Sequence, residues 1–368
     1  MDTNITVNSP QSVKRWATGL AVDYAKNLYF KKFIGTAETS VIQEKVDLNS
    51  SEGDEIKFDL SMRLRERATY GDNALQGKEE QLKFLQDTVK IDQMRKAASG
   101  GGRMTRQRTL HDLRMIAKNR TAEYCAEWAD EGLIIYLSGD AGIQGMNQDS
   151  IFGTTEFAGN PIEAPDAAHM AYGGVAVSKA TIAATDKMSV GVIERVSNRA
   201  MMLNARDPNV VAMRPVKVDG ADHFVMLMNP DQNYDLRTST APNDWNEIQK
   251  VAGARGKENN IFSGNKGMIN NVVLQEHTNV RRFSDYGAGS NVAAARALFM
   301  GRQAGTIAYG RGNGARMTWV EELTDYKSKV GIAAGMICGF KKTRYKSQGG
   351  AGSDFGVIAV DTAAKAPN

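Results

Sequence analysis

The stretch from residue 41 to residue 98 restricts the fold of this chain more than any other. Between residues 56 and 64, apolar side chains alternate with polar ones, which is the period of a strand with one buried face. Proline is absent from residues 11–160, so long helices and strands can form there without interruption. A polar stretch at residues 69–77 divides the segment in two. We therefore expect an extended, charged arm with little core of its own.

The arm is expected to begin with a hairpin. A strand at residues 41–48 would be joined to the alternating strand at 56–64 through the turn-forming residues 49–53. After the polar tip, we predict a helix at 78–86 and a strand at 88–92. Because a two-stranded hairpin is marginal in water by itself, its apolar face needs a partner surface. That surface belongs either to the body of the same chain or to a second copy, and composition does not separate the two.

The N-terminus presents a second projecting element. Residues 12–34 predict an amphipathic helix, with Ser12 as its cap and Gly35 as its end. Trp16 and Leu20 lie on its apolar stripe, which another surface must cover. Two such elements in one chain favour a protein that its neighbours complete, because the same contacts can then recur around a closed assembly.

The remainder of the chain mixes helices and strands without a βαβ rhythm, so we predict the α+β class. Thr109 and Asp112 resemble a capping box, which begins a helix of about 28 residues and about 42 Å. Further expected elements are a flexible break at 99–102, a loop at 139–180, helices at 186–204 and 291–304, a hairpin at 216–228, and strands at 329–340 and 355–360.

No catalytic constellation is apparent in the sequence. The four histidines are scattered along the chain, and neither the HExxH nor the GxSxG motif occurs. Residues 71–78 resemble a phosphate-binding loop, but five residues separate the two glycines, and Glu79 follows the lysine where it would repel phosphates. We therefore predict no enzyme activity, no cofactor and no metal site.

The composition narrows the environment of the protein. Cys125 and Cys338 lie far apart in apolar neighbourhoods, which indicates buried free thiols in a reducing cell interior. The N-terminus has no basic start followed by an apolar run, and no stretch reaches the roughly 18 apolar residues of a membrane span. We expect neither secretion nor a membrane partner.

Basic side chains form two clusters on a chain whose net charge is only +4. One lies around Arg103 and Arg106, and the other at residues 341–346 beside Phe340 and Tyr345, which are stacking candidates for a nucleic acid. The alternative is a solvated or subunit-facing surface. We favour the alternative, because acidic residues lie nearby and no recognition motif is present.

Several blocks of sequence, in order along residues 36–362, carry a resemblance to a known family. They are GDEIKF at 53–58 with LSMRLR at 60–65, YGDNALQGKEE at 70–80, IDQMR at 91–95, and GFKKT at 339–343 with DFGVI at 354–358; residues 261–264 and 293–303 fit as well. The sequence resembles the major capsid proteins of tailed double-stranded DNA bacteriophages, most closely the podovirus-type family that includes the N-four-like phages. Gln76 departs from the more hydrophobic or acidic residue expected there.

The resemblance implies the shell fold of tailed-phage coats, with a spine helix in its peripheral domain. The implied divisions are an N-terminal arm at 1–39, an extended loop at 40–98, a peripheral domain at 99–180, an axial domain at 181–328, and C-terminal strands at 329–368 that return to the peripheral domain.

The implied function is structural, as a subunit that self-assembles into an icosahedral head shell around the phage genome. The expected partners are copies of itself in pentamers and hexamers, a portal protein, a decoration protein, packaged double-stranded DNA bound without sequence specificity and, because the chain begins almost directly with its arm, a separate scaffolding protein. Assembly would take place in the host cytoplasm and the mature location would be the virion. A cellular compartment shell of the encapsulin type is the alternative with the same fold, and a DNA-binding protein of another class is a more distant one.

Two sets of residues are candidates for these contacts. Those expected between subunits are Trp16, Leu20, Ile56, Phe58, Leu60, Met62, Leu64, Tyr70, Asp72, Lys78, Glu79 and Glu80. Those expected to face DNA are Lys14, Arg15, Arg103 and Arg106.

Overall fold

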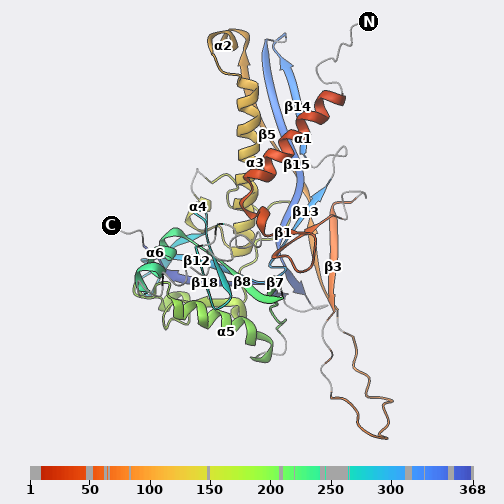
Figure 1. The fold of residues 1–368 in the computed structure, drawn as a ribbon, viewed down its shortest axis with the longest axis vertical. Helices are drawn as coiled ribbons and strands as arrows, with labels where there is room; N and C mark the ends of the chain where they lie inside the picture. The colour runs from red at the N-terminus through yellow and green to blue at the C-terminus, as the bar shows by residue number, and fades with distance from the viewer. Residues whose placement is uncertain are drawn as a thin grey trace.

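The computed structural model describes most of the 368 residues. The described residues are 10–46, 53–61, 64, 67–82, 84–146, 150–206, 210–218, 220–240, 245, 264, 266–310, 317–326, 328–346 and 352–365. The molecule is elongated, with α2 (Arg103–Arg108) at one end of its long axis and the tip of the arm at the other (Figure 1).

A six-stranded sheet forms the upper part of the molecule. Its strands run in the order β1 (Ile34–Gly35), β2 (Ile42–Lys45), β13 (Gly305–Gly310), β15 (Lys329–Lys342) and β14 (Met317–Thr324), with β5 (Asp92–Gly102) also paired to β15. The long helix α3 (Leu113–Ser138) lies beside this sheet (Figure 1).

Capping residues define both ends of helix α3. The Asp112 carboxylate accepts hydrogen bonds from the backbone N–H groups of Arg114 at 3.0 Å and Met115 at 3.2 Å, which caps the first turn. Gly139 ends the helix in the left-handed conformation, with φ of 67°. The last eleven residues of the helix, 128–138, are all buried, so the helix enters the core as it runs toward its C-terminus.

An eight-stranded sheet forms the lower part. Its main path is β6 (Met170–Tyr172), β18 (Val357–Ala363), β12 (Val292–Met300), β8 (Ala221–Met228), β10 (Val272–Glu276) and β9 (Gly267–Ile269), with β11 (Arg282–Tyr286) paired to β12 and β7 (Val216–Val218) to β8. One face packs on α5 (Val190–Arg206), and the other joins the core around α3. The helix α6 (Pro230–Ser239) follows β8 directly, capped by Asn229.

A four-stranded sheet forms the base of the arm. Its order is β17 (Gly352–Asp354), β16 (Arg344–Lys346), β4 (Phe84–Lys90) and β3 (Glu55–Ser61). Short helical turns complete the fold: η1 (Tyr29–Lys32), α4 (Gly142–Met146), η3 (Ala167–His169) and η4 (Lys179–Thr181).

The α+β class and several expected elements are confirmed. The spine helix has 26 residues, the hairpin around Gly220 forms between β7 and β8, and β15 and β18 occupy the two expected C-terminal strands. The described residues of 139–180 contain only short elements within a long connection. Cys125 and Cys338 are free and buried, as expected.

The helix expected at 291–304 is wrong, because residues 292–300 form the strand β12. Leu298 and Met300 face the core around α3, whereas Ala297 and Phe299 face α5. A strand that is buried on both faces carries no polar alternation, so its sequence does not distinguish it from a buried helix.

Three expectations within the arm are also wrong. Strand β3 pairs with β4 in antiparallel fashion, while β2 pairs in parallel with β13, so residues 41–48 and 56–64 do not form a hairpin. No helix occupies the described part of 78–86, where β4 begins at Phe84. The break expected at 99–102 is the end of β5, which pairs with β15.

The expected boundary at residues 328 and 329 does not coincide with the division between the sheets. Strands β13 and β14 precede this boundary but lie in the same sheet as β15. Strand β18 follows it and lies in the eight-stranded sheet, between β6 and β12. The chain therefore crosses between the two parts more often than the linear division implies.

Candidate functional site at the projecting arm

The base of the arm packs against the body of its own chain. Ile56 on β3 is buried with Val89 on β4 and Ala308 on β13. Phe58 contacts Tyr345 edge to face, with ring centroids 6.1 Å apart. The expectation that this apolar face waits for a neighbour is therefore wrong for β3, because β13 and β16 already cover it.

The remaining candidate on β3 follows the same pattern. Leu60 packs with Leu85 against a buried cluster that contains Val211 and Phe355. Ile56 and Leu60 therefore have partners within the chain, although Leu60 is only half-buried. Met62 lies outside the described residues.

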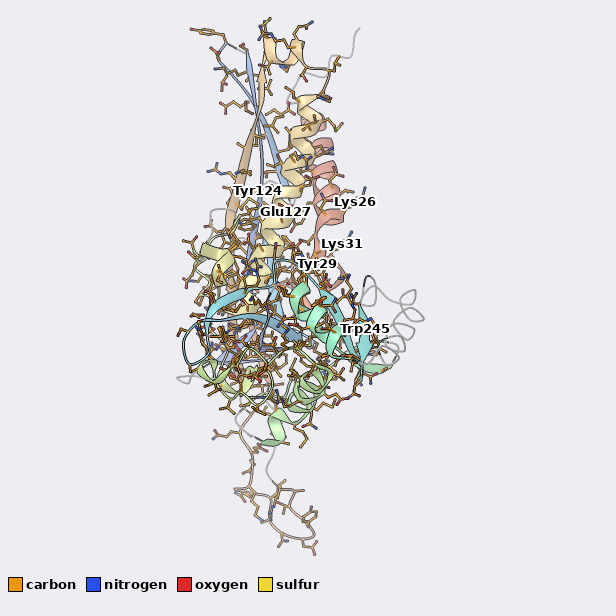
Figure 2. The ribbon with its side chains drawn as sticks, turned by 90° about the vertical axis from the view of Figure 1, so that its left-hand side faces the viewer. Lys26, Tyr29, Lys31, Tyr124, Glu127 and Trp245 are labelled. Carbon is orange, nitrogen blue, oxygen red and sulfur yellow. The ribbon has the colours of Figure 1, made fainter. Side chains whose placement is uncertain are left out.

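The tip of the arm differs sharply from its base. Residues 67–82 contain turns but no helix or strand, and they stand away from the body (Figures 1 and 2). Tyr70 is 78% exposed and Leu75 is 63% exposed. Neither side chain belongs to a buried cluster of the described residues, and the same holds for Leu64 and Leu82. The tip thus presents apolar side chains to solvent.

Local hydrogen bonds give the tip a defined shape. The Asn73 amide donates to the carbonyl of Tyr70 at 2.7 Å, and the backbone N–H of Lys78 donates to the carbonyl of Leu75 at 3.0 Å. The backbone N–H of Gly77 donates to the Glu79 carboxylate at 2.8 Å. These contacts close two turns, so the exposed side chains are partly preorganised.

The candidate residues on the tip lie close together in the chain and point to solvent. Leu64, Asp72, Lys78 and Glu79 are exposed, and Glu80 is partly exposed. Sequence reasoning missed Leu75 and Leu82, which are exposed to the same degree. Their apolar character within a polar loop was the signal that could have identified them.

The N-terminal helix α1 (Pro10–Asn27) folds back onto the body, where it contacts α3 and β14. Leu20 is fully buried there. The Tyr24 hydroxyl lies 3.2 Å from that of Tyr309, and Lys118 on α3 donates to Asp23 at 2.6 Å. The expectation that Leu20 contacts a neighbour is therefore wrong, because α3 already covers it. Helix α1 includes Lys14, Arg15 and Trp16, whose side chains lie outside the described part of the structure.

Asp130 on α3 holds the end of this N-terminal segment. Its carboxylate accepts hydrogen bonds from the backbone N–H groups of Tyr29 at 2.8 Å and Phe30 at 3.1 Å. Burial raises the pKa of Asp130 to about 7, and Glu127 adds to the rise, although the two hydrogen bonds lower it. Figure 2 shows Tyr29 beside the part of α3 that carries Glu127.

The two basic clusters lie in different settings. Arg103 and Arg106 are exposed on α2, where Arg106 donates to the carbonyl of Ser328 at 3.4 Å. In the second cluster Lys341 pairs with Asp87, Lys342 with Asp354, and Lys346 with Glu163. Phe340 and Tyr345 are buried, so they offer no stacking surface for nucleic acid, while Lys346 at the end of the cluster is exposed.

The end of the molecule that carries α2 is a second region that sequence reasoning missed. Met104, Leu110 and Tyr326 are all exposed there. Tyr326 lies in the turn between β14 and β15 with φ of 48°, so the turn geometry holds it outward. Apolar residues in a turn were again the available signal.

The described residues contain no arrangement that favours catalysis. No group of three or more His, Cys, Asp and Glu side chains among them is placed to hold a metal ion. Burial raises the pKa of Cys125 to about 12, which keeps this thiol protonated and unreactive. Across the ranges that the structure describes, no helix is long and apolar enough to cross a membrane.

Solved structures share this fold. The chain matches the capsid of Ralstonia phage GP4 with a TM-score of 0.87 and 50% sequence identity, and the match covers 100% of both chains. The capsid asymmetric unit of cyanophage Pam1 matches with a TM-score of 0.70 and 18% identity, over 100% of this chain and 96% of the other. The class of protein that this fold defines is the phage capsid subunit.

Sequence comparison specifies the family. The model of the phage capsid protein family matches residues 4–366. A protein named major capsid protein from Pseudomonas phage KPP25 is 27% identical over 356 residues, which is 92% of each chain. The chain belongs to the phage capsid protein family. Its role is that of a major capsid protein, a structural subunit of the virion shell, and the encapsulin alternative is not favoured.

Proposed function

We propose that each subunit closes the shell by placing the tip of its arm on a neighbouring subunit within pentamers and hexamers. The observation that carries this proposal is the contrast between the packed base of the arm and its exposed, apolar tip. An arm that projects away from its own body reaches a surface on another copy, and each copy both gives and receives this contact.

The energetics favour a contact of moderate strength. Burying apolar surface stabilises by roughly 25 cal/mol per Å², or about 1.5–3 kcal/mol for each large side chain. Tyr70 and Leu75 together would contribute about 3 kcal/mol per arm, which is about a hundredfold in the association constant of one contact. The turns at Asn73 and Gly77 lower the entropy lost on docking. Many such contacts close a shell while each one stays reversible during assembly.

The charged residues of the tip fit the same role. Asp72, Lys78 and Glu79 are exposed near the apolar residues in the sequence and carry both signs of charge. A charged rim contributes little affinity at an exposed interface but selects orientation, because like charges in contact disfavour the wrong alignment. In this proposal the charged residues set the alignment of the tip on its neighbour, and the apolar residues supply the affinity.

We propose three further protein partners, which membership of the phage capsid protein family implies. A shell of identical subunits has no entrance, so a different protein, the portal, occupies the site of DNA entry. A separate scaffolding protein assists assembly while pentamers and hexamers of one chain form in the host cytoplasm. A decoration protein would bind the finished outer surface.

The genome that the shell encloses is double-stranded DNA, held without sequence specificity. Arg103 and Arg106 are exposed on α2, and Lys14 and Arg15 belong to the N-terminal helix. A net charge of +4 is small for a chain of 368 residues, so contacts with phosphate are few and salt-dependent. An inner shell surface with few such contacts would allow DNA to be packaged and released without binding it tightly. We assign the subunit no catalytic activity and no cofactor.

Deletion of residues 66–80 tests the proposed function. The base of the arm retains its packing, so the variant subunit is expected to be soluble and folded but unable to form closed shells. The pair Tyr70→Ala with Leu75→Ala is a milder form, and assembly should then require about a hundredfold more protein. Light scattering and negative-stain electron microscopy measure both effects.

The matched control is Tyr70→Phe with Leu75→Met, which keeps the apolar surface at the same two positions. This variant should assemble like the original chain. Normal closed shells from the deletion variant would show that the tip is not needed for assembly, and the proposed function would then be wrong.

A further inference from the structure

The arm joins the body at β4, where two buried polar contacts lie three residues apart in the chain. The first involves Asp87, which is 4% exposed. Its carboxylate pairs with the Lys341 ammonium group on β15 and accepts a hydrogen bond from the backbone N–H of Arg344 at 3.0 Å. The Lys341 ammonium group also donates to the carbonyl of Thr88 at 3.0 Å. The Lys341 side chain on β15 thus contacts both a side chain and a backbone carbonyl of β4, and Arg344 adds a contact from β16.

The second contact involves Asn160, which is 2% exposed. Its side-chain amide accepts from the backbone N–H of Lys90 at 2.9 Å and donates to the carbonyl of the same residue at 2.8 Å. The backbone carbonyl of Asn160 accepts from the Tyr136 hydroxyl at 2.9 Å. Because Tyr136 lies on α3, this contact links the arm to the spine helix.

The two contacts come from different elements of the body. A single contact would act as a pivot, whereas contacts at Asp87 and Lys90 from two separate elements oppose rotation of β4. The tip lies about ten residues beyond Asp87, or up to about 33 Å along an extended strand. A rotation of about 10° at the base would then move the tip by about 6 Å, which exceeds the distance of a side-chain contact.

We propose that Asp87 and Asn160, here called the anchors, are positioning residues that fix the direction in which the arm leaves the body. This inference rests on the proposed function, in which the tip reaches a neighbouring subunit. A buried lysine–carboxylate pair contributes little net stability compared with apolar residues of the same volume. Its directional hydrogen bonds are what an apolar replacement lacks. The direction of the arm, and through it the curvature of the shell, is the property that these residues supply.

The test measures the arm directly in the unassembled full chain. Spin labels at Ala74→Cys in the tip and Glu194→Cys on α5 report the distance between arm and body, since both positions are exposed and the two native cysteines are buried. Pulsed electron paramagnetic resonance gives the distribution of this distance. The parent chain should give a narrow distribution, and Asp87→Asn with Asn160→Ala should give one about twice as wide.

A second variant keeps the test valid if the first one does not fold. Asp87→Asn with Lys341→Met removes both charges together, which avoids an unpaired buried charge. It is expected to unfold cooperatively near the temperature of the parent chain while still broadening the distribution. A distribution as narrow as that of the parent in this folded variant would overturn the inference.

The matched control is Glu163→Gln, which weakens the more exposed ion pairs of Arg344 and Lys346 near the same sheet and leaves both anchors intact. Its distribution should stay narrow. If Glu163→Gln broadened the distribution as much as the anchor variants, the effect would be a general loosening, and the assignment to Asp87 and Asn160 would be wrong.

Shell geometry completes the test. The anchor variants should assemble into particles with a wider range of diameters than the parent chain, as measured by electron microscopy. A broad arm distribution with shells of uniform, parental diameter would refute the link to curvature. Failure of the proposed function gives a different result, because the deletion of 66–80 would then assemble normally whatever the distance measurement shows.

Discussion

The base and the tip of the arm belong to one hairpin, but only the base packs its apolar side chains against its own chain. At the base, Ile56, Phe58 and Leu60 alternate inward and find apolar partners on β4, β13 and β16. At the tip, Tyr70 and Leu75 have similar apolar character, but no described part of the chain covers them. The base therefore contributes to the stability of the subunit, whereas the tip is available for association between subunits.

The N-terminal helix resembles the base and not the tip. Leu20 and Tyr24 are buried against α3 and β13, and Asp130 fixes the turn that follows. Of the two projecting elements expected from the sequence, only the outer part of the arm is without a partner inside the described chain. A single subunit is thus more complete than the sequence indicates.

The largest effect is expected where the base of the arm crosses β15. A Cβ atom at Gly339 would lie 1.9 Å from the carbonyl oxygen of Lys90, and backbone atoms cannot move aside as a flexible side chain can. Gly339→Ala should therefore destabilise the subunit by more than about 4 kcal/mol or prevent its folding. Urea unfolding of the unassembled subunit measures the loss.

Gly331→Ala on the same strand is the matched control. The nearest atom to a Cβ there is the carbonyl oxygen of Glu322 at 3.7 Å, which is an ordinary contact. This variant should stay within about 1 kcal/mol of the parent chain. Equal effects of the two substitutions would mean that the base is not closely packed on β15, and the contrast with the tip would be lost.

A pH series tests whether the N-terminal segment behaves like the base. The pKa of Asp130 is about 7 in the folded chain, well above the ordinary value of about 3.9 that applies after unfolding. The folded state therefore binds this proton more tightly, and its contribution to stability falls as the pH rises from about 4 to about 7. Relative to Asp130→Asn, the unfolding free energy of the parent chain should fall by about 3 kcal/mol across this window.

Glu123→Gln provides the comparison for that series, since Glu123 lies on the same helix but is half exposed beside Arg120. This substitution removes a carboxylate from the same helix and leaves Asp130 in place. If the Asp130→Asn curve were parallel to that of the parent chain, Asp130 would not be buried by the N-terminal segment in solution.

The smallest effect on folding is expected at the tip. Tyr70→Ala with Leu75→Ala should change the unfolding free energy of the unassembled subunit by less than about 0.5 kcal/mol, because both side chains are already in water. The same pair is expected to weaken assembly strongly. A large loss of subunit stability would instead place these side chains against the body of their own chain.

The local elements of the arm could be predicted better than their partners. The alternation at 56–64 indicated β3, and the polar run at 69–77 indicated the projecting tip. The pairing of β3 was wrong because nothing local distinguishes a strand at 42–45 from one at 84–90 as its partner. The covering of Ile56 by Ala308 depends on residues about 250 positions apart, which periodicity does not report.

The charged residues show the same limit. Lys341 and Lys342 have the spacing of an exposed basic cluster, yet each has a buried carboxylate partner. Asp87 is 254 positions from Lys341, so the pair exists only after the fold has formed. Of the predicted site, the residues at the tip could be identified from local sequence, whereas the anchors at the base could not.

The place of β18 has a consequence for the order of events during synthesis. This strand lies between β6 and β12 in the eight-stranded sheet, and residues 357–363 leave the ribosome after every other strand of that sheet. Until then β6 has no neighbour on that side, and the edge of β12 remains open. A translation product that stops short of residue 357 lacks the strand that joins β6 to β12, so its eight-stranded sheet stays incomplete.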